Sequence, residues 1–390
     1  MKCLFLLVPQ LDYGGQERYV ATLSKILKDV YNVKIITYVS KVVGYETACE
    51  VINLRDLMPI RRQKWVQKLF GVRGRIKALH KLYRIYHPVA CISFGGGANR
   101  LNVEARKKNI RVYLSLRAYS SVKQYSTNWM DRLSVRLADG VLCVSEQIKD
   151  ELVRVYPNQS NKFRCLYNAY DMDGIAKENT LPRKSESDGN IHIMSLGRIS
   201  EVKGYWHLIK AFSIVKEDVN NVVLDIYGTY QFAEHKKALD VLSEKLGLNG
   251  SVFFHGNTNR PYAQLWSSDI YVLSSITEGF PNALVEAMAC GLPVIANDCK
   301  SGPREILSCV DKPEDKYIVT EFGILTPQLS SAVNMNPDIV ENEEKVLADA
   351  IIVLCKNKET RELLSKKGHE RAGSFSYEAC RSKIIELIEE

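Results

Sequence analysis

An acidic pair brackets the start of a predicted helix in residues 278–293, which read EGFPNALVEAMACGLP. Pro281 suits the first position of a helix, where its missing N–H leaves no bond unmade, and Gly291 suits the residue after the helix end. Backbone N–H groups at a helix start carry partial positive charge and suit hydroxyl or phosphate oxygens. Glu278 and Glu286 could accept hydrogen bonds from two sets of sugar hydroxyls. The alternative is a helix-capping acid and a solvent-facing one, because charged residues mostly lie at the surface.

Two cations share one loop earlier in the chain. Residues 195–204 read SLGRISEVKG and leave a predicted strand to enter a predicted helix. Arg198 and Lys203 could clamp a diphosphate there, since a guanidinium forks onto phosphate oxygens and an ammonium acts as a point charge. The alternative is two solvated loop cations. The pair is notable because residues 185–390 carry 21 Lys and Arg against 30 Asp and Glu, a net charge of −9.

These motifs, in this order, resemble glycosyltransferase family 4. The chain carries GGQER at 14–18, GR-x4-KG at 197–204, E-x7-E at 278–286 and CGLPV at 290–294. The runs SF at 93–94, AN at 98–99 and KSGPREIL at 300–307 are similar to bacterial members that extend lipid-linked oligosaccharides for surface polysaccharides or glycans. The resemblance spans the chain and is more specific in its C-terminal half. It implies an α/β protein of the GT-B fold, with two Rossmann-like doubly wound domains facing a central cleft, and transfer with retention of anomeric configuration.

The resemblance also implies roles for the matching residues. Arg198 and Lys203 would hold the donor diphosphate, Glu278 would bind hydroxyls of the transferred sugar, and Glu286 would bind the nucleotide ribose. Arg198, Lys203 and Glu278 would carry catalysis by positioning and electrostatics, with no side-chain nucleophile and with the leaving phosphate helping to deprotonate the acceptor hydroxyl. The other expected donor contacts are Gly14, Gly15, Gly279, Phe280, Pro281 and Asn282. The expected acceptor contacts are Gly15, Gly96, Asn99 and Arg117.

Three features depart from the family pattern or imitate another one. Many family members carry His where this chain has Arg117, which could hold an acceptor phosphate or be a surface arginine. Residues 171–173 read DMD, the DxD of metal-dependent glycosyltransferases, but the family resemblance favours a structural role for them and no bound metal or other cofactor. The run GGG at 95–97 lacks the spacing of a dinucleotide fingerprint and is interpreted as a flexible loop facing the cleft.

Alternating strand and helix patterns place these residues at strand ends. Strands are expected at 2–8, 33–38, 89–94, 111–116, 140–144, 163–166, 191–196, 222–227, 252–255, 270–274 and 293–296, and helices at 16–28, 205–216, 238–246 and 377–389. This alternation predicts parallel sheets covered on both faces, which bind ligands at the carboxyl ends of their strands.

The polar stretch at 177–190, KENTLPRKSESDGN, divides the chain. We expect a basic, membrane-facing acceptor domain at 1–180, a linker at 181–190, a nucleotide-sugar domain at 191–374, and a helix at 375–390 that crosses back toward the first domain.

Positive charge gathers in the first half. Residues 1–184 carry 32 Lys and Arg against 15 Asp and Glu, a net charge of +17, and residues 57–103 contain no acid. Apolar residues at 65, 69, 72, 76, 79, 83 and 86 form one helical stripe, which is typical of a membrane-surface helix when basic residues flank it. We expect 76–86 to be core and 59–72 to contact the membrane. The alternative is that the stripe packs on the sheet and the charges are solvated. The expected membrane contacts are Arg61, Arg62, Lys64, Trp65, Lys68 and Phe70.

Composition narrows the class of protein. The 46% hydrophobic and 25% charged fractions are those of a globular protein, no apolar run approaches the roughly 20 residues of a spanning helix, and ten cysteines lack metal-ligand spacing. We therefore expect a cytoplasmic protein, peripheral on the inner face of the cell membrane and a monomer or weak dimer. Its partners would be a nucleotide sugar and a lipid-linked (polyprenyl-diphosphate) saccharide. The family resemblance favours a UDP-sugar as the nucleotide sugar. Two alternatives stay open: an inactive glycosyltransferase-like scaffold, and a nucleic-acid-binding protein, which would leave the Glu278 and Glu286 helix unexplained.

Overall fold

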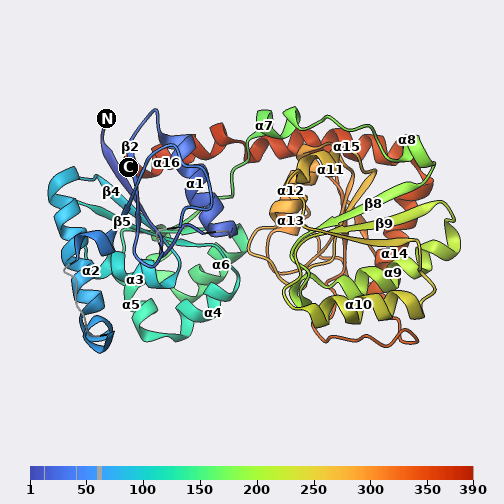
Figure 1. The fold of residues 1–390 in the computed structure, drawn as a ribbon, viewed down its shortest axis with the longest axis horizontal. Helices are drawn as coiled ribbons and strands as arrows, with labels where there is room; N and C mark the ends of the chain where they lie inside the picture. The colour runs from blue at the N-terminus through green and yellow to red at the C-terminus, as the bar shows by residue number, and fades with distance from the viewer. Residues whose placement is uncertain (13, 41, 59–63, 390) are drawn as a thin grey trace. The chain divides into compact units, whose positions relative to one another are not determined.

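The computed structural model describes residues 1–12, 14–40, 42–58 and 64–389, without the side chains of 64–70. The chain forms two compact units (Figure 1). Unit 1 comprises Met1–Ala169 and Tyr377–Glu390, and unit 2 comprises Tyr170–Ser376. Unit 1 therefore contains two separate stretches of the chain.

Unit 1 is built on a parallel sheet of seven strands in the order β3-β2-β1-β4-β5-β6-β7. Its strands are β1 Cys3–Leu7, β2 Asn32–Thr37, β3 Glu50–Asn53, β4 Ala90–Phe94, β5 Arg111–Leu116, β6 Gly140–Cys143 and β7 Phe163–Cys165. Its helices are α1 Gly15–Leu27, α2 Lys64–Tyr86, α3 Gly96–Glu104, α4 Ser120–Thr127, α5 Trp129–Leu137, α6 Glu146–Val155 and α16 Tyr377–Glu389. The central strands β1 and β4 are buried along their whole length, as expected for a sheet covered on both faces.

Helices close both faces of this sheet. On one face, Leu23 of α1 shares a buried cluster with Ile384 and Ile388 of α16. On the other face, Leu79 of α2 and Leu101 of α3 form a second cluster with Phe5 and Leu7 of β1. The expected core role of 76–86 is thus confirmed by the side chains that face this cluster. The expected membrane contacts Arg61, Arg62, Lys64, Trp65, Lys68 and Phe70 lie outside the described side chains.

Unit 2 repeats the architecture with a sheet in the order β10-β9-β8-β11-β12-β14-β13, in which only β13 runs antiparallel. Its strands are β8 Ile191–Leu196, β9 Val222–Tyr227, β10 Val252–Gly256, β11 Ile270–Leu273, β12 Val294–Asn297, β13 Ile318–Val319 and β14 Ile324–Thr326. Its helices are α7 Met172–Lys177, α8 Ser185–Asp188, α9 Tyr205–Asp218, α10 Ala233–Lys245, α11 Pro261–Trp266, α12 Asn282–Ala289, α13 Pro303–Ile306, α14 Asn342–Lys356 and α15 Lys358–Ala372. Helices α9 and α14 pack on one face through the main apolar cluster, and α12 packs on β11 and β12 from the other.

Two segments differ from the sequence expectations. The glycine run at 95–97, expected as a flexible loop, starts helix α3, with Gly95 before the helix at φ 87°. Glycine tolerates this left-handed backbone, so the run ends strand β4 and begins a helix within a few residues. The expected linker at 181–190 is part of unit 2, where it contains α8 and where the backbone N–H of Lys184 donates to the carbonyl of Ser267 at 2.9 Å.

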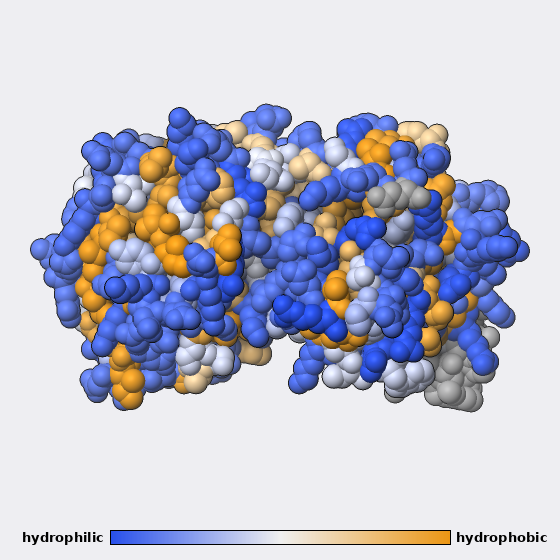
Figure 2. All heavy atoms as spheres, turned by 180° about the vertical axis from the view of Figure 1, so that it is seen from behind, coloured by the Kyte–Doolittle hydropathy of each residue, from blue (hydrophilic) through white to orange (hydrophobic). Residues whose placement is uncertain are grey.

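Within the described residues, no helix has both the length and the apolar composition needed to cross a lipid bilayer. Hydrophilic residues cover most of the face seen in Figure 2, with hydrophobic residues visible between them.

A buried carboxylate fastens the 184–192 segment to the sheet of unit 2. Asp225 in β9 accepts hydrogen bonds from His192 Nδ1 at 2.7 Å, from Lys184 Nζ at 3.0 Å and from His255 Nε2. Burial alone would raise the pKa of Asp225, but the bonds from His192 and His255 and the charge of Lys184 outweigh it and hold that pKa well below its usual range. Burial likewise opposes the charged form of His192, yet the hydrogen bonds to Asp225 and Asp188 raise its pKa overall.

This network predicts a pH-dependent stability. The contribution of Asp225 is present above its ordinary pKa of about 3.9 and is lost as pH falls, whereas that of His192 is present below about pH 6.5 and is lost as pH rises through its raised pKa. Asp225→Asn should therefore lower the free energy of unfolding by roughly 1.5–3 kcal/mol, with the largest loss between about pH 4 and 6.5. Thermal unfolding across pH measures the difference, and NMR titration should show a lower His192 pKa in the variant. An equal loss at all pH values would contradict this account.

Candidate active site

The two predicted site loops of unit 2 meet because their strands are neighbours. Strands β8 and β11 pair in parallel, so their carboxyl ends lie at one edge of the sheet. The loop after β8 carries Arg198 and Lys203, and the loop after β11 carries Glu278. Backbone bonds join the loops, since the N–H of Ile276 donates to the carbonyl of Val202 at 2.8 Å.

A charge pair lies at the centre of this contact. Lys203 Nζ is 2.6 Å from Glu278 Oε1, with the side chains 22% and 14% exposed. Ser275 Oγ donates to the same carboxylate oxygen at 2.7 Å. Arg198 lies on the same loop as Lys203 and is exposed. The arrangement offers one cation and one carboxylate, both partly accessible, within a few ångströms of each other.

Two glycines allow neighbouring segments to approach closely here, Gly204 between the two site loops and Gly302 between the segment after β12 and the loop after β11. Gly204 has φ +60°, and a Cβ built there would be 2.2 Å from the carbonyl oxygen of Ser274. Gly302 has φ +109°, and its Cβ would be 2.5 Å from Cδ of Pro281. Because a side chain would meet a neighbouring segment at either position, glycine is required for the observed packing.

The 278–293 segment differs in one detail from the sequence expectation. Helix α12 begins at Asn282, and Pro281 is the residue before it with ψ 96°, not the first helical residue. Phe280 is buried, and the centres of its ring and the Phe375 ring are 5.4 Å apart. Gly279 and Phe280 can therefore offer a ligand only backbone groups. Asn282 Oδ1 accepts from the Tyr170 hydroxyl at 2.7 Å. Gly291 ends the helix with φ +67°, as the sequence indicates.

Glu286 lies inside the structure instead of facing solvent. It is 4% exposed, and the hydroxyl of Tyr262 in α11 donates to its Oε1 at 3.3 Å. Tyr262 and Ser275, the partners of the two glutamates, lie outside the motifs that the sequence singles out. Ser275 stands three residues before Glu278, a spacing that could have been noticed, but nothing in the sequence connects Tyr262 to Glu286.

In unit 1, Arg117 is held by its neighbours at the end of β5. Its guanidinium lies 3.7 Å from the centre of the Tyr19 ring and donates to the carbonyl of Leu166 at 3.2 Å and to Asn168 Oδ1. Tyr19 belongs to α1, which begins at Gly15, directly after Gly14. Helix α1 and the end of β5 are therefore linked through Arg117 and Tyr19.

Asn99 does not fit its expected role as an acceptor contact. Its side chain is fully buried and bonds Ser93 Oγ at 2.8 Å and the Tyr125 hydroxyl at 2.7 Å. Both ends of its amide are thus used to hold α3 against β4 and α4. Gly96, in the first turn of α3, is half-buried, and a Cβ there would be 2.7 Å from Nε2 of Gln124.

The DxD-like residues include a helix cap. Asp171 precedes α7, and its Oδ1 accepts from the backbone N–H of Gly174 at 2.9 Å. This contact fits the structural role expected of the motif.

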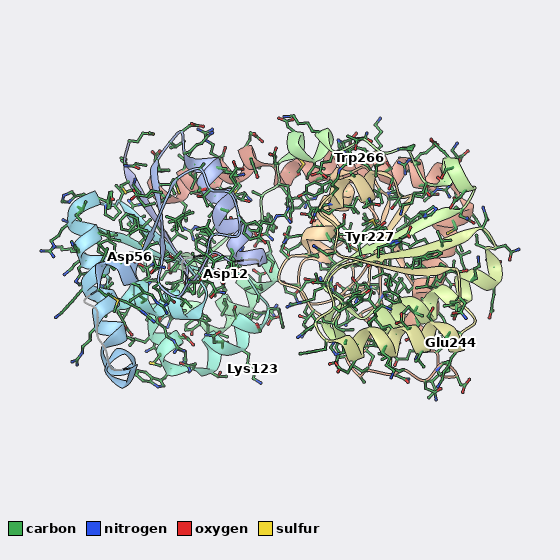
Figure 3. All side chains as sticks on the ribbon, viewed as in Figure 1. Asp12, Asp56, Lys123, Tyr227, Glu244 and Trp266 are labelled. Atoms are coloured by element: carbon green, nitrogen blue, oxygen red, sulfur yellow. The ribbon has the colours of Figure 1, made fainter. Side chains whose placement is uncertain are left out.

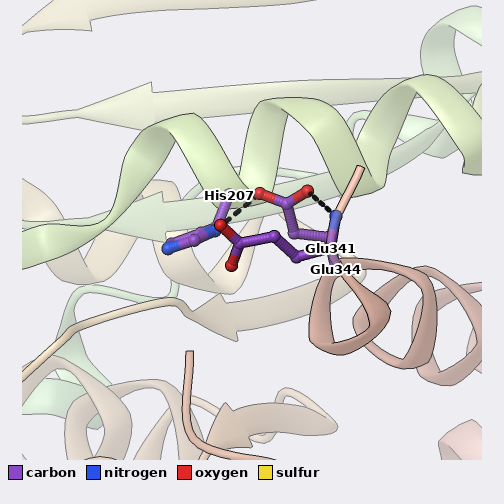
Figure 4. Close-up of side chains that lie close together, drawn as sticks. All are labelled: His207, Glu341 and Glu344. Atoms are coloured by element: carbon purple, nitrogen blue, oxygen red, sulfur yellow. Dashed lines mark hydrogen bonds and ion pairs between the residues drawn. The ribbon is translucent and has the colours of Figure 1, made fainter. Parts of the chain in front are cut away.

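The described residues contain one group with possible metal-ligand geometry, His207, Glu341 and Glu344 (Figure 4). His207 Nδ1 lies 2.6 Å from Glu344 Oε1, and His207 Nε2 lies 2.9 Å from the carbonyl of Ser330. The other Glu344 oxygen accepts from the backbone N–H of Glu341 at 2.8 Å. With Lys210 Nζ also 3.9 Å from Glu344, the group is better described as a buried link between α9 and α14 than as a metal site.

Two family models match this chain. Residues 13–173 match glycosyltransferase family 4, and residues 177–320 match the glycosyl transferases group 1 model. The chain belongs to glycosyltransferase family 4. Family 4 is a retaining family of the GT-B fold.

Relatives in the family differ in how far they align. An uncharacterized glycosyltransferase from Methanocaldococcus jannaschii is 33% identical over 266 residues, covering 65% of this chain and 64% of the relative. The N-acetylgalactosamine-N,N'-diacetylbacillosaminyl-diphospho-undecaprenol 4-alpha-N-acetylgalactosaminyltransferase of Campylobacter jejuni is 26% identical over 384 residues, covering 96% of each chain. Anabaena HepE, solved in complex with UDP, superposes with a TM-score of 0.77 at 18% identity over the whole of both chains. This likeness confirms the expected GT-B fold.

The packing at Gly204 leads to a test of the site's architecture. Gly204→Ala and Gly247→Ala both place alanine at positive φ, +60° and +69°, which costs roughly 1–2 kcal/mol. Nothing lies within 4 Å of a Cβ at 247, whereas Gly204→Ala collides with the carbonyl of Ser274. Gly204→Ala should therefore destabilise the protein by about 1 kcal/mol or more beyond Gly247→Ala in chemical denaturation. Equal losses would show that the loops can separate freely.

Proposed function

We propose that this protein transfers a hexose or N-acetylhexosamine from a nucleotide sugar, a UDP-sugar, to a lipid-linked saccharide, with retention of configuration. The reaction would take place at the cytoplasmic face of the membrane, in surface polysaccharide or glycan synthesis. The observation that carries the donor part is the pair Lys203 and Glu278 at 2.6 Å. The acceptor part is supported by the Campylobacter relative, whose name describes an undecaprenol-linked acceptor and which aligns over 96% of the chain.

The charge pair suits a ligand that is anionic at one end and rich in hydroxyls at the other. A donor entering the site would exchange the Lys203 to Glu278 contact for two new ones, phosphate oxygens on Lys203 and sugar hydroxyls on Glu278. Arg198 would add a second cation from the same loop. Glu286, buried and bonded by Tyr262, would accept from the ribose hydroxyls. The donor nucleotide is proposed as UDP because HepE was solved with it.

The chemistry needs no protein nucleophile. The bond between the anomeric carbon and the diphosphate oxygen breaks, and its electron pair stays on the diphosphate. The acceptor hydroxyl oxygen forms the new bond on the same face of the sugar, and its proton passes to the departing phosphate oxygen. Lys203 and Arg198 stabilise the charge that grows on the diphosphate, which is the largest contribution expected from such a site.

We propose that unit 1 binds the acceptor. Arg117 is partly exposed at the end of β5, where its orientation over Tyr19 is fixed, and it would contact an acceptor phosphate. Gly14 and Gly15 would let the first loop approach the substrates. The structure offers no similar support for Asn99, which is fully enclosed. That this chemistry proceeds without a bound metal stays a prediction.

Substitutions at the charge pair test the donor site. Lys203→Ala and Glu278→Ala should each lower kcat by about 10²–10³, because each removes a charge that acts on the transition state. Glu244→Ala and Lys245→Ala, in the last turn of α10, are matched controls that should leave activity unchanged (Figure 3). The assay is transfer from UDP-sugars to a polyprenyl-diphosphate saccharide. Wild-type activity in both Lys203→Ala and Glu278→Ala would disprove the assignment.

Binding of UDP gives a test that needs no acceptor. UDP at about 100 times its Kd should stabilise the protein by about 2.7 kcal/mol in thermal unfolding. Glu286→Gln should weaken UDP binding by roughly 10–100-fold, since it replaces a charged acceptor of ribose hydroxyls with an amide of the same shape. Glu359→Gln, on the exposed side of α15, is the control. If the unfolding temperature rises with another nucleotide but not with UDP, the donor carries that other nucleotide.

A further inference from the structure

Helix α5 exposes a stripe of large apolar side chains. Trp129 is 71% exposed, and Met130, Leu133 and Leu137 are 37%, 44% and 39% exposed. At about 100° per residue these four side chains span roughly 100° of the helix surface. The stripe is therefore one continuous face and not a set of scattered residues.

A different face of the same helix holds it to unit 1. Asp131, Ser134 and Val135 are buried, and Asp131 makes two hydrogen bonds with Arg100 of α3, at 2.6 and 2.7 Å. Asn128 caps the helix start through the N–H groups of Met130 and Asp131. Helix α5 contacts α3 and α4 at the periphery of unit 1 (Figure 1). Fixed in this way, it presents the stripe as a rigid surface.

Cations border the stripe. Arg132 and Arg136 lie on the third face of α5, and both are exposed. Arg106 donates to the carbonyl of Leu137 at 3.2 Å and is followed by exposed Lys107 and Lys108. Exposed Lys123 lies on α4, which contacts α5 (Figure 3).

Fewer acids than cations lie nearby. Asp131 is neutralised by Arg100. Exposed Asp139 and Glu104 keep their negative charge, against the six exposed cations named above.

We propose that the α5 stripe is a docking surface for an anionic lipid membrane. Trp and Leu on one face and Arg beside them are the composition of helices that lie in the headgroup region. Trp129 would enter that region from the start of the helix, and the arginines would meet lipid phosphates. The proposal rests on the proposed function in that a lipid-linked acceptor gives the enzyme a reason to bind the membrane, but it concerns a surface whose binding is measured without transfer.

The charge and size of the surface favour lipid over other occupants. A second copy of this face would bring arginines against arginines, and a nine-residue helix, about 13 Å long, is small for a stable dimer interface. A nucleic-acid backbone would use the cations but would leave Leu133, Leu137 and Met130 without a partner. A lipid surface uses both the cations and the apolar side chains.

Vesicle flotation tests the surface directly. The wild type should bind vesicles of phosphatidylcholine with 30% phosphatidylglycerol and bind pure phosphatidylcholine weakly. Trp129→Ser/Leu133→Ser should lower binding to the anionic vesicles about tenfold or more, because the stripe loses its two most exposed apolar side chains. Val241→Ser/Leu363→Ser removes exposed apolar side chains from unit 2 and should bind like the wild type.

A second variant separates charge from apolar contact. Arg132→Gln/Arg136→Gln should also lower binding by about tenfold at low salt, with a smaller loss at high salt. Lys358→Gln/Lys366→Gln, on exposed positions of α15, should not. Unchanged thermal unfolding shows that each variant is folded.

Several results would overturn the proposal. The first is that the wild type does not bind anionic vesicles, and the second is that Trp129→Ser/Leu133→Ser binds them as well as the wild type does. The third is that the wild type is a dimer and Trp129→Ser/Leu133→Ser is a monomer. The fourth is that the wild type binds duplex DNA but not vesicles. Transfer to a short, water-soluble acceptor should be unaffected in Trp129→Ser/Leu133→Ser. If the wild type fails to transfer to any acceptor but still binds vesicles through the stripe, the proposed function falls and the docking surface stands.

Discussion

The ion pair between Lys203 and Glu278 forms only because the fold of unit 2 brings their two loops together. The 2.6 Å separation joins two loops that are 75 residues apart in the chain. It depends on the parallel pairing of β8 with β11, on the missing side chain at Gly204, and on the hydroxyl of Ser275 at the same carboxylate. Because the two charges satisfy each other without a ligand, each is oriented before a donor arrives, so little reorganisation is needed on binding.

Unit 2 also contains more deeply buried charges away from this pair. Asp225 gathers three donors beneath the 184–192 segment, and His207 with Glu344 links α9 to α14. A buried ionic group adds little net stability compared with apolar packing, but breaking one leaves an uncompensated charge. These networks therefore restrict the ways in which segments can pack against the sheet more than they strengthen it.

The sequence predicted those parts of the fold that local pattern determines. Strands β5, β8 and β9 have the expected bounds, because each is an apolar run with clear ends, and the loops that follow β8 and β11 carry the expected charges. What the sequence could not show depends on tertiary contacts. Asn99 looks like a polar residue in a loop, but it is enclosed by Ser93 and Tyr125 from two other elements. In the same way, Val135 and Leu133 of α5 are alike in sequence, yet one is buried and the other faces outward. Strands β13 and β14 are too short to give a pattern.

The return of α16 to unit 1 has a consequence for how the chain folds during synthesis. Cys380, Ile384 and Ile388 complete the cluster that covers one face of the first sheet, and they follow the whole of unit 2 in the chain. Domains usually fold in order as they leave the ribosome. Here part of the apolar face of the first sheet stays exposed to solvent until more than 200 further residues have been synthesised. The second unit can thus finish folding before the first, and a nascent chain would need protection of the α1 surface during that interval.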